Sequence, residues 1–222
     1  MNRFPSRALL PSLLLLPCLL LPFRARAADR AARLAQAAEA FQRALAGDAG
    51  AVGRAEALYR ELAAEDPSDP VVLACAGSAA AMAGRDARSP LERLRRTEDG
   101  LSEVDLALRR LGPAHHDQRQ PGRLPARLET LLVAASTYLA VPDAVFHRLG
   151  DGKAALAAAL SDPAAAEAPA AVRARLEWLS ALVARAEGRP GDERAALSRA
   201  LALDPEGLLS PRARARLAEV AP

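Results

Sequence analysis

The run His115-His116-Asp117 is the one group of neighbouring side chains in this sequence whose types could bind a metal ion. His147 is the remaining histidine, and it could join the run only from a separate turn. A catalytic zinc ion usually takes three ligands that are spaced along the chain so that they converge on the ion. Three consecutive loop residues cannot all point at one ion, so we interpret the run as a solvated loop and predict no metal site.

Sequence motifs for nucleophilic catalysis and for phosphate binding are absent. The sequence contains no Gly-x-Ser-x-Gly turn, so His115 has no evident partner for a hydrolase triad. It also contains neither of the glycine-rich patterns GxxxxGK[ST] and GxGxxG, which bind nucleotide phosphates. We therefore predict that the protein is not an enzyme and that it has no catalytic residues and no cofactor.

Residues 1–27 have the three parts of a secretory signal peptide. A basic start is followed by a leucine-rich stretch over residues 9–23 and then by Ala25-Arg26-Ala27, a small-x-small cleavage pattern. Cleavage after Ala27 would release a periplasmic or secreted chain. The apolar stretch is shorter than the ~20 residues of a membrane span and contains three prolines, so no stable span is expected after cleavage.

Two alternatives to a cleaved leader remain open. The segment could be retained as a signal anchor, or Cys18 could be a lipidated cysteine, although Pro17 stands where a lipoprotein has a small residue. After cleavage Cys75 would be the one remaining cysteine, so no intramolecular disulfide could form. Cys75 lies in an alanine-rich stretch, and we interpret it as a small core residue.

The formal charge of +3 would favour a nucleic-acid partner if it belonged to the folded region. Residues 1–27 contain four arginines and no acid, however, which leaves 26 of the 30 basic residues against 27 acidic residues in the remainder. This near-neutral balance argues against nucleic-acid binding. Lys153 is the only lysine, and we interpret the excess of arginine as the coding bias of a GC-rich bacterium.

Two segments of the chain share the spacing of an apolar helical stripe that ends at a proline. The first comprises Ala55, Tyr59, Leu62 and Pro67. The second comprises Leu197, Ala200 and Pro205, with Gly188 at a turn before it. A fainter third copy ends at Asp162-Pro163.

This pattern resembles the tetratricopeptide-repeat (TPR) family, whose second helix carries alanine, an aromatic, alanine and proline at offsets 0, 4, 7 and 12. Leu62 replaces the second alanine, and Glu193 occupies the first position of the second copy. The three prolines are 96 and 42 residues apart, which are not multiples of the 34-residue family period. The resemblance implies antiparallel helix pairs stacked as a short α-solenoid over residues 28–222.

The composition independently favours an all-α fold, because apolar residues make up 51% of the chain and aromatic residues only 3%. We expect roughly nine helices and one irregular loop at residues 112–125.

Trp178 is predicted to lie in the core, with a binding-groove role as the alternative. Residues 142–146 are predicted to form a turn packed on the core, with a partner contact as the alternative. The predicted helices cover residues 29–46, 50–65, 70–83, 90–111, 126–139, 151–160, 170–186, 192–205 and 211–220.

Stacked helix pairs form a concave surface that binds peptides or other proteins. Behind a signal peptide, such a surface predicts an exported, non-catalytic, TPR-like adaptor or scaffold of the bacterial cell envelope with a protein or peptide partner. Two alternatives stay open: an enzyme with an unrecognised site, and a self-assembling structural protein.

Overall fold

The computed structural model describes residues 21–117 and 124–220 of the chain, and in these residues helices are the only regular secondary structure. Nine of the described helices have ten residues or more, and three are single turns. The prediction of an all-α protein is therefore confirmed. None of the described helices combines the length and the hydropathy that a membrane crossing requires.

The helices follow one another along the chain with short connections. The longer ones are α1 (Leu21–Leu45), α2 (Ala49–Glu65), α3 (Pro70–Asp86), α4 (Pro90–Arg109), α6 (Ala126–Ala140), α8 (Leu149–Leu160), α10 (Ala170–Ala186), α11 (Pro190–Leu203) and α12 (Ser210–Glu219). The single turns are α5 (Ala114–Asp117), α7 (Asp143–Phe146) and α9 (Pro163–Glu167).

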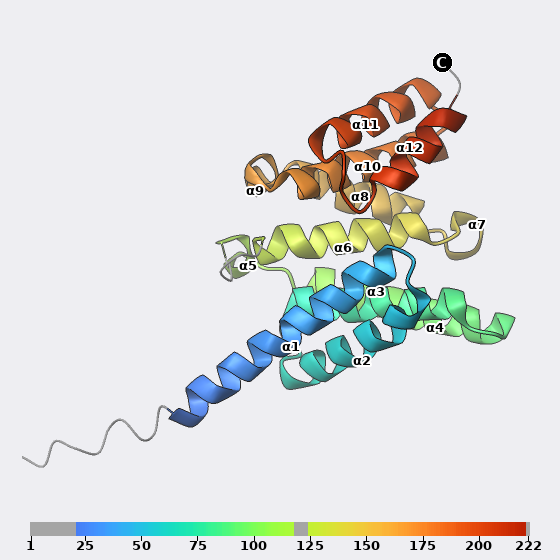
Figure 1. Cartoon of the computed structure of the whole chain (residues 1–222). Coiled ribbons are helices and arrows are strands. Elements are labelled where there is room, and N and C mark those ends of the chain that lie inside the picture. The colour runs from blue at the N-terminus through green and yellow to red at the C-terminus, as the bar shows by residue number, and fades with distance from the viewer. Residues whose placement is uncertain (1–20, 118–123, 221–222) are drawn as a thin grey trace, which may run out of the picture.

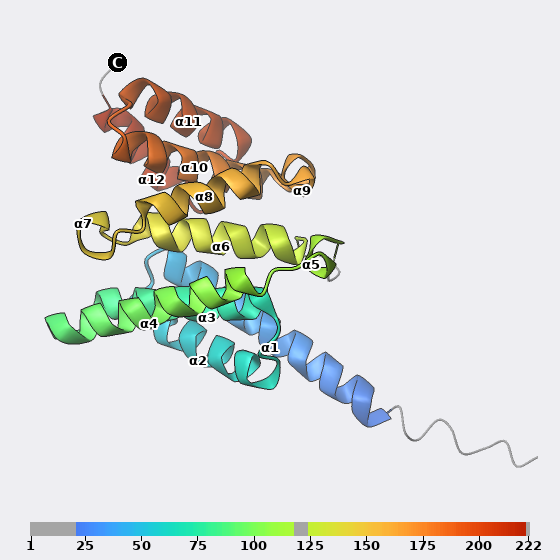
Figure 2. The same ribbon diagram turned by 180° about the vertical axis from the view of Figure 1, so that it is seen from behind.

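Helices that are consecutive among the longer ones pack in pairs. The pairs are α1 with α2, α3 with α4, α6 with α8, and α10 with α11, and α12 packs on α11. The pairs are arranged one after another along the long axis of the molecule, from α1 and α2 at one end to α11 and α12 at the other (Figure 1). In the opposite view α6 crosses the middle of the molecule, where it contacts both α3 and α10 (Figure 2).

Local sequence signals explain where many of these helices begin. The Ser89 hydroxyl accepts a hydrogen bond from the backbone N–H of Glu92 at 3.1 Å, and a proline occupies the first helical position of α4. This is the predicted N-cap. Asp48, Asp69 and Asp162 cap α2, α3 and α9 in the same way. Such caps satisfy backbone N–H groups that have no partner inside the helix.

The N-terminal helix is longer than the sequence predicted. It begins at Leu21 and so runs through the predicted cleavage site at Ala27. Alanine and arginine dominate residues 24–33, and both favour helix, while Pro22 lies in the first turn where proline is tolerated. Residues 1–20, which form most of the predicted signal peptide and include Cys18, lie outside the described residues.

Two short helices depart from the predicted connections. The predicted irregular loop at 112–125 contains the single turn α5, and residues 118–123 of that loop lie outside the described part. The turn α9 was not predicted, although Asp162 caps it and Pro163 occupies its first position. A helix of five residues has too little apolar pattern to be recognised in a sequence.

The core is built from small side chains and is centred on α3. Fourteen of the 17 residues of α3 are buried, so this helix is enclosed on nearly all sides. The predicted core residue Cys75 is 3% exposed. Trp178 is partly buried and packs against two clusters of core residues, which agrees with its predicted structural role.

A polar cluster fixes α8 against α4 and α6. The Tyr138 hydroxyl donates to an Asp105 carboxylate oxygen at 2.5 Å, and the Arg148 guanidinium donates to the other oxygen at 2.8 Å. The same guanidinium lies 5.4 Å from the centre of the Tyr138 ring. Burial, together with the hydrogen bond to Asp105, raises the pKa of Tyr138, so the phenol stays protonated. We interpret this cluster as structural.

Several surface carboxylates have pKa values below their usual range. Hydrogen bonds from Arg43, Ser68 and Arg85 lower the pKa values of Asp48, Asp66 and Asp86 respectively. Lys153 and Arg189 similarly lower the pKa of Glu187. Burial raises the pKa of the Glu103 carboxyl, so the pKa of this group shifts in the opposite direction to the other four.

These shifts predict loss of stability in acid. A carboxylate whose pKa is lower in the folded state stabilises the fold above its unfolded pKa, and this contribution disappears as the pH falls through the folded pKa. Four groups shift in this direction and one in the other. We expect the Tm to be nearly constant from about pH 7 to pH 5 and to fall below about pH 4.

Thermal unfolding followed by circular dichroism over this pH range would measure the effect. The variant Asp48→Asn is a matched control, because asparagine also caps helices but does not titrate. Its Tm should depend less on pH than that of the native protein. A Tm at pH 3 equal to that at pH 6 would contradict the prediction.

Candidate functional site

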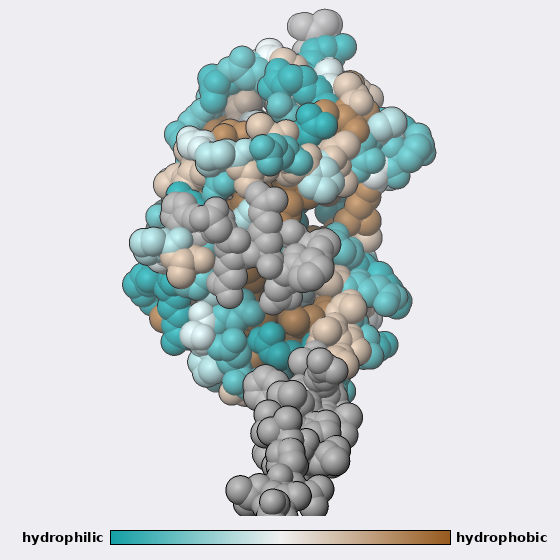
Figure 3. Space-filling view, turned by 90° about the vertical axis from the view of Figure 1, so that its left-hand side faces the viewer, coloured by the Kyte–Doolittle hydropathy of each residue, from teal (hydrophilic) through white to brown (hydrophobic). Residues whose placement is uncertain are grey.

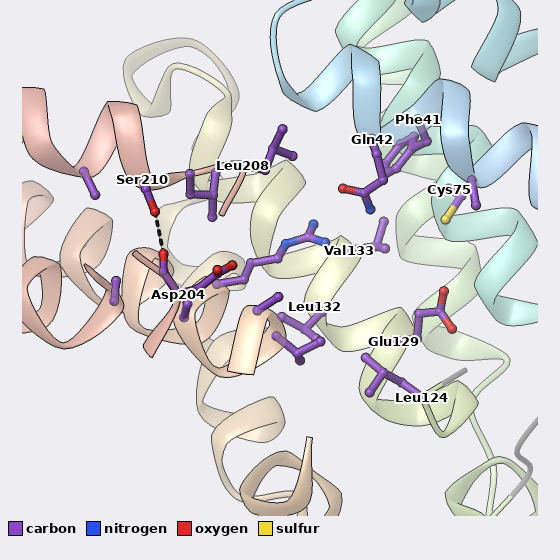
Figure 4. Close-up of a pocket in the computed structure, with 18 of the residues that line it drawn as sticks. Phe41, Gln42, Cys75, Leu124, Glu129, Leu132, Val133, Asp204, Leu208 and Ser210 are labelled. Atoms are coloured by element: carbon purple, nitrogen blue, oxygen red, sulfur yellow. Dashed lines mark hydrogen bonds between the residues drawn. The ribbon is translucent and has the colours of Figure 1, made fainter. Parts of the chain in front are cut away.

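The main candidate site is a groove between the two halves of the molecule, with a cavity of about 260 Å³. Helices α1, α3 and α6 form one side of it, and α10, α11 and α12 form the other (Figure 4). We call this cavity the central groove. Its lining is mainly apolar and includes Phe41, Leu132, Val133, Val172, Leu201 and Leu208.

One face of the protein has the opposite character (Figure 3). On the face turned toward the reader in Figure 3, hydrophilic side chains cover most of the described surface, and apolar surface is visible mainly in the recesses between them. A mainly apolar cavity with a few polar groups is typical of a ligand-binding site.

Among the described residues, Arg175 on α10 is the one basic residue in the lining of the central groove. Its Nε and Nη2 atoms donate to the Ser136 hydroxyl on α6, at 3.1 and 2.8 Å. That hydroxyl in turn donates to the carbonyl oxygen of Leu132 at 2.7 Å. Ser136 therefore uses its one hydrogen and both lone pairs, and it fixes the orientation of the guanidinium.

The Arg175 side chain is partly buried, and none of the ion pairs among the described residues includes it. Burial lowers its pKa, and the neighbouring Cys75 and Glu129 oppose this only in part. None of the described carboxylates lies within 4 Å of it, whereas Arg216 and Arg148 each pair with two. The segments outside the description contain no acidic side chain.

Two carboxylates also line the central groove. Glu129 projects from α6, and Asp204 ends α11. They lie on opposite sides of the groove in Figure 4. The Asp204 backbone carbonyl accepts a hydrogen bond from the Ser210 hydroxyl at 2.5 Å, which joins the end of α11 to the start of α12. Among the described residues, the lining of the groove thus combines apolar walls with one basic and two acidic side chains.

The predicted repeat residues lie mostly between helices rather than in the groove. Ala55, Tyr59 and Leu62 form one buried stripe on α2, and Leu197 and Ala200 are buried on α11. Tyr59 and Ala200 are the members of this set that also reach the groove lining.

The remaining members of the predicted set lie in turns. Pro67 follows α2, and Pro205 follows α11. Gly188 joins α10 to α11 with a φ of +67°, a left-handed conformation that glycine adopts without strain. Glu193, at the first position of the second copy, is 3% exposed and accepts hydrogen bonds from Arg216, one of them at 2.6 Å.

Arg175 and Ser136 were not among the residues predicted from the sequence. A signal for Arg175 is nevertheless present, because Val172, Leu179 and Leu182 lie three before, four after and seven after it. An arginine on the apolar stripe of a helix will be buried when that stripe packs. Ser136 gave no comparable signal.

His147 lies far in the fold from the adjacent pair His115 and His116. His115 and His116 lie in α5, where the backbone N–H of Gly112 donates to His115 Nδ1 at 3.0 Å. His147 ends α7, at the opposite end of α6 (Figure 1). In residues 21–117 and 124–220 no three histidine, cysteine or acidic side chains are placed to hold a metal ion.

A second apolar cavity, of about 470 Å³, lies where α3, α4, α6 and α7 meet. We call it the lateral groove. Of the turn at residues 142–146 that was predicted to pack on the core, only Phe146 does so, and residues 142–145 are exposed, with Val145 at 55%. Leu94, also in its lining, is 37% exposed.

Comparisons of the chain with known protein families, with curated proteins and with solved structures found no match. The function must therefore be argued from the two grooves and their side chains.

Proposed function

We propose that this protein is an exported, non-catalytic, TPR-like adaptor or scaffold of the bacterial cell envelope, and that it binds a segment of another protein in the central groove. The observation that carries the proposal is the lining of that groove. The first helices of the successive pairs, α1, α3, α6 and α10, contribute to it together with α11 and α12. Stacked helical repeats bind peptides on a surface of this kind.

Two further observations support the wider proposal. The stripe of Ala55, Tyr59 and Leu62 packs between helices, which is the role that the TPR resemblance implies for these residues. The N-terminal sequence has the basic, apolar and small-residue parts of an export signal. A periplasmic or secreted location follows from that signal.

Self-association through the lateral groove is the second candidate function. Leu94 and Val145 expose apolar surface there, and Leu91 nearby is 75% exposed. Apolar patches on a soluble protein often mark interaction surfaces. A second copy of the chain could cover this one.

A pair of matched variants distinguishes the two functions. Leu208 lines the central groove and is 45% exposed, and Leu94 lines the lateral groove and is 37% exposed. Glutamate at either position places a charge where an apolar partner surface must dock. We expect Leu208→Glu to reduce partner capture by about tenfold or more and Leu94→Glu to leave it unchanged.

The experiment uses the full-length protein, expressed with its own leader and a C-terminal tag, and captures its partner from envelope extract. Circular dichroism checks that both variants remain helical. Equal capture by the native protein and by Leu208→Glu would overturn the adaptor proposal for this groove. Gel filtration of the same samples tests self-association, which Leu94→Glu should abolish if the lateral groove joins two copies.

A further inference from the structure

Basic side chains gather at the lateral groove. Among the described residues its lining includes Arg85 on α3, Arg93 on α4 and Arg212 on α12, and it includes no aspartate or glutamate. The lining of the central groove, in contrast, has one basic and two acidic side chains. The two grooves have no lining residue in common, so each can bind a ligand of its own.

Two of these three arginines have no carboxylate beside them. Arg85 forms a two-bond pair with Asp86, with N–O distances of 2.8 and 3.0 Å. Arg93 instead donates from Nε to the backbone carbonyl oxygen of the residue after α3, at 2.7 Å. Arg212 extends toward the turn between α1 and α2, where its Nη2 lies 3.6 Å from the position of a Cβ atom on Gly47. Neither Arg93 nor Arg212 forms an ion pair with a described carboxylate, so both charges can act on a bound anion.

The Arg93 guanidinium presents a free edge. Its Nε is used by the hydrogen bond to the end of α3, and among the described residues its Nη1 and Nη2 have no hydrogen-bond partner. These two atoms can donate parallel hydrogen bonds to the two oxygens of a carboxylate. Arg93 is exposed, however, and an exposed ion pair contributes little affinity. Most of the binding must therefore come from the apolar part of the ligand.

The walls of the lateral groove are mainly aliphatic. The start of α4 and the turn α7 project from the same side of the molecule and border it (Figure 2). Its aliphatic lining includes Leu45, Ala81, Met82, Leu94, Val141 and Val145. The cavity of about 470 Å³ lies in the size range of small-molecule sites. Methionine adapts its shape to a flexible ligand.

Two buried hydroxyls in this lining are already hydrogen-bonded. The Thr137 hydroxyl donates to the carbonyl oxygen of Val133 at 2.8 Å and is hydrogen-bonded to the Ser78 hydroxyl at 2.9 Å. The one aromatic side chain in the described lining, Phe146, packs against the core. A planar polar ligand would find few partners here. The lining favours a ligand with an aliphatic body and a negative charge at one end.

We propose that the lateral groove binds a free fatty acid, with its aliphatic chain along α3, α4, α6 and α7 and its carboxylate at Arg93 and Arg212. This ligand has the one flexible chain and the one negative charge that the lining matches. A second copy of this protein is less favoured as the occupant. A twofold contact between two copies would bring the same arginines together.

Isothermal titration calorimetry with the full-length protein tests the proposal. The probes are decanoate, decanol, decylammonium and butyrate, each below the concentration at which it forms micelles. Decanoate is expected to bind at one site and at least about tenfold more tightly than decanol, because only decanoate carries the charge. Decylammonium has the same chain with the opposite charge, and butyrate has the charge with almost no chain. Both should bind more weakly than decanol.

Two leucine-sized positions of similar exposure show whether the lateral groove is the site. Val145 lines this groove and is 55% exposed, whereas Leu160 on α8 is 52% exposed and lies outside it. Val145→Glu places a negative charge where the chain must lie. It should weaken decanoate binding by about tenfold or more, and Leu160→Glu should leave it unchanged.

Arginine variants test the role of the charge. Arg93→Met and Arg212→Met keep an apolar side chain and should each reduce the preference for decanoate over decanol. The double variant should abolish this preference. Arg95→Met is the matched control, because Arg95 is also exposed on α4 but does not line the groove. Should Arg93→Met fail to fold, Arg212→Met remains, since Arg212 has no ion pair to lose among the described residues.

Equal affinities for decanoate and decanol, or no binding of decanoate, would overturn this inference. Decanoate binding that Val145→Glu does not change would overturn it too. Tighter binding of decyl phosphate than of decanoate would assign the site to a phosphate headgroup instead of a fatty acid. A dimer that Leu94→Glu dissociates and decanoate does not would show that a second copy occupies the groove. Partner capture through Leu208 enters none of these results, so the proposed function is tested separately.

Discussion

Replacement of Gly100 by alanine should reduce the free energy of unfolding by about 3 kcal/mol, although alanine favours helix more than glycine does. A Cβ atom at this position would lie 2.4 Å from the Gly77 carbonyl oxygen and 2.6 Å from the Ala81 backbone nitrogen. Both are backbone atoms of α3 and cannot rotate away. The two helices would have to separate along their closest contact.

The same contact recurs along the interface of α3 and α4. A Cβ at Gly77 would lie 2.5 Å from the Gly100 carbonyl oxygen, and one at Gly84 would lie 2.5 Å from the Thr97 hydroxyl. Three glycines thus let the two helices approach at backbone distance. Separation at Gly100 would loosen the packing of α3, which is the most enclosed helix of the described fold.

Urea denaturation of Gly100→Ala, followed by circular dichroism, would measure the effect. Gly53→Ala is the control. Gly53 also lies inside a helix, α2, but a Cβ there has no neighbour within 4 Å. Gly53→Ala should therefore stabilise the protein by roughly 0.5–1 kcal/mol. The same substitution is expected to have opposite signs at the two positions. A Gly100→Ala protein as stable as the native one would show that backbone contact does not limit the approach of α3 and α4.

Phe41→Ala is expected to be the most damaging truncation of a single core side chain, with a loss of about 3–5 kcal/mol. Phe41 on α1 is 3% exposed, and its ring lies 5.8 Å from the Tyr59 ring on α2 at an interplanar angle of 83°. Aromatic residues make up only 3% of the chain, so this edge-to-face pair supplies an unusual share of the contact area in an alanine-rich core.

Urea denaturation also measures this prediction, and Phe146→Ala is the matched control. Phe146 is only partly buried, on the single turn α7, so the same truncation there should cost about 1 kcal/mol. Equal losses at the two positions would contradict the role assigned to the aromatic pair. Phe41 also lines the central groove, so its truncation does not separate stability from binding.

The sequence alone determined the helices and most of their ends. The predicted helix over residues 170–186 has the same bounds as α10, and the predicted cap at Ser89 is present at the start of α4. These features could be predicted because helix propensity, capping and apolar periodicity act between residues a few positions apart. The buried stripe of Ala55, Tyr59 and Leu62 was likewise visible as a pattern within one helix.

The tertiary structure decided the candidate site. Arg175 and Ser136 are 39 residues apart and lie on different helices, and the groove around them joins residues from α1 to α12. The sequence placed Arg175 on an apolar stripe, but it gave no sign that this stripe would border a cavity or that a serine would hold the guanidinium. Local interactions specify each helix, whereas the distances and angles between helices depend on how their side chains pack. The groove, its charges and the glycine contacts of α3 and α4 exist only after that packing.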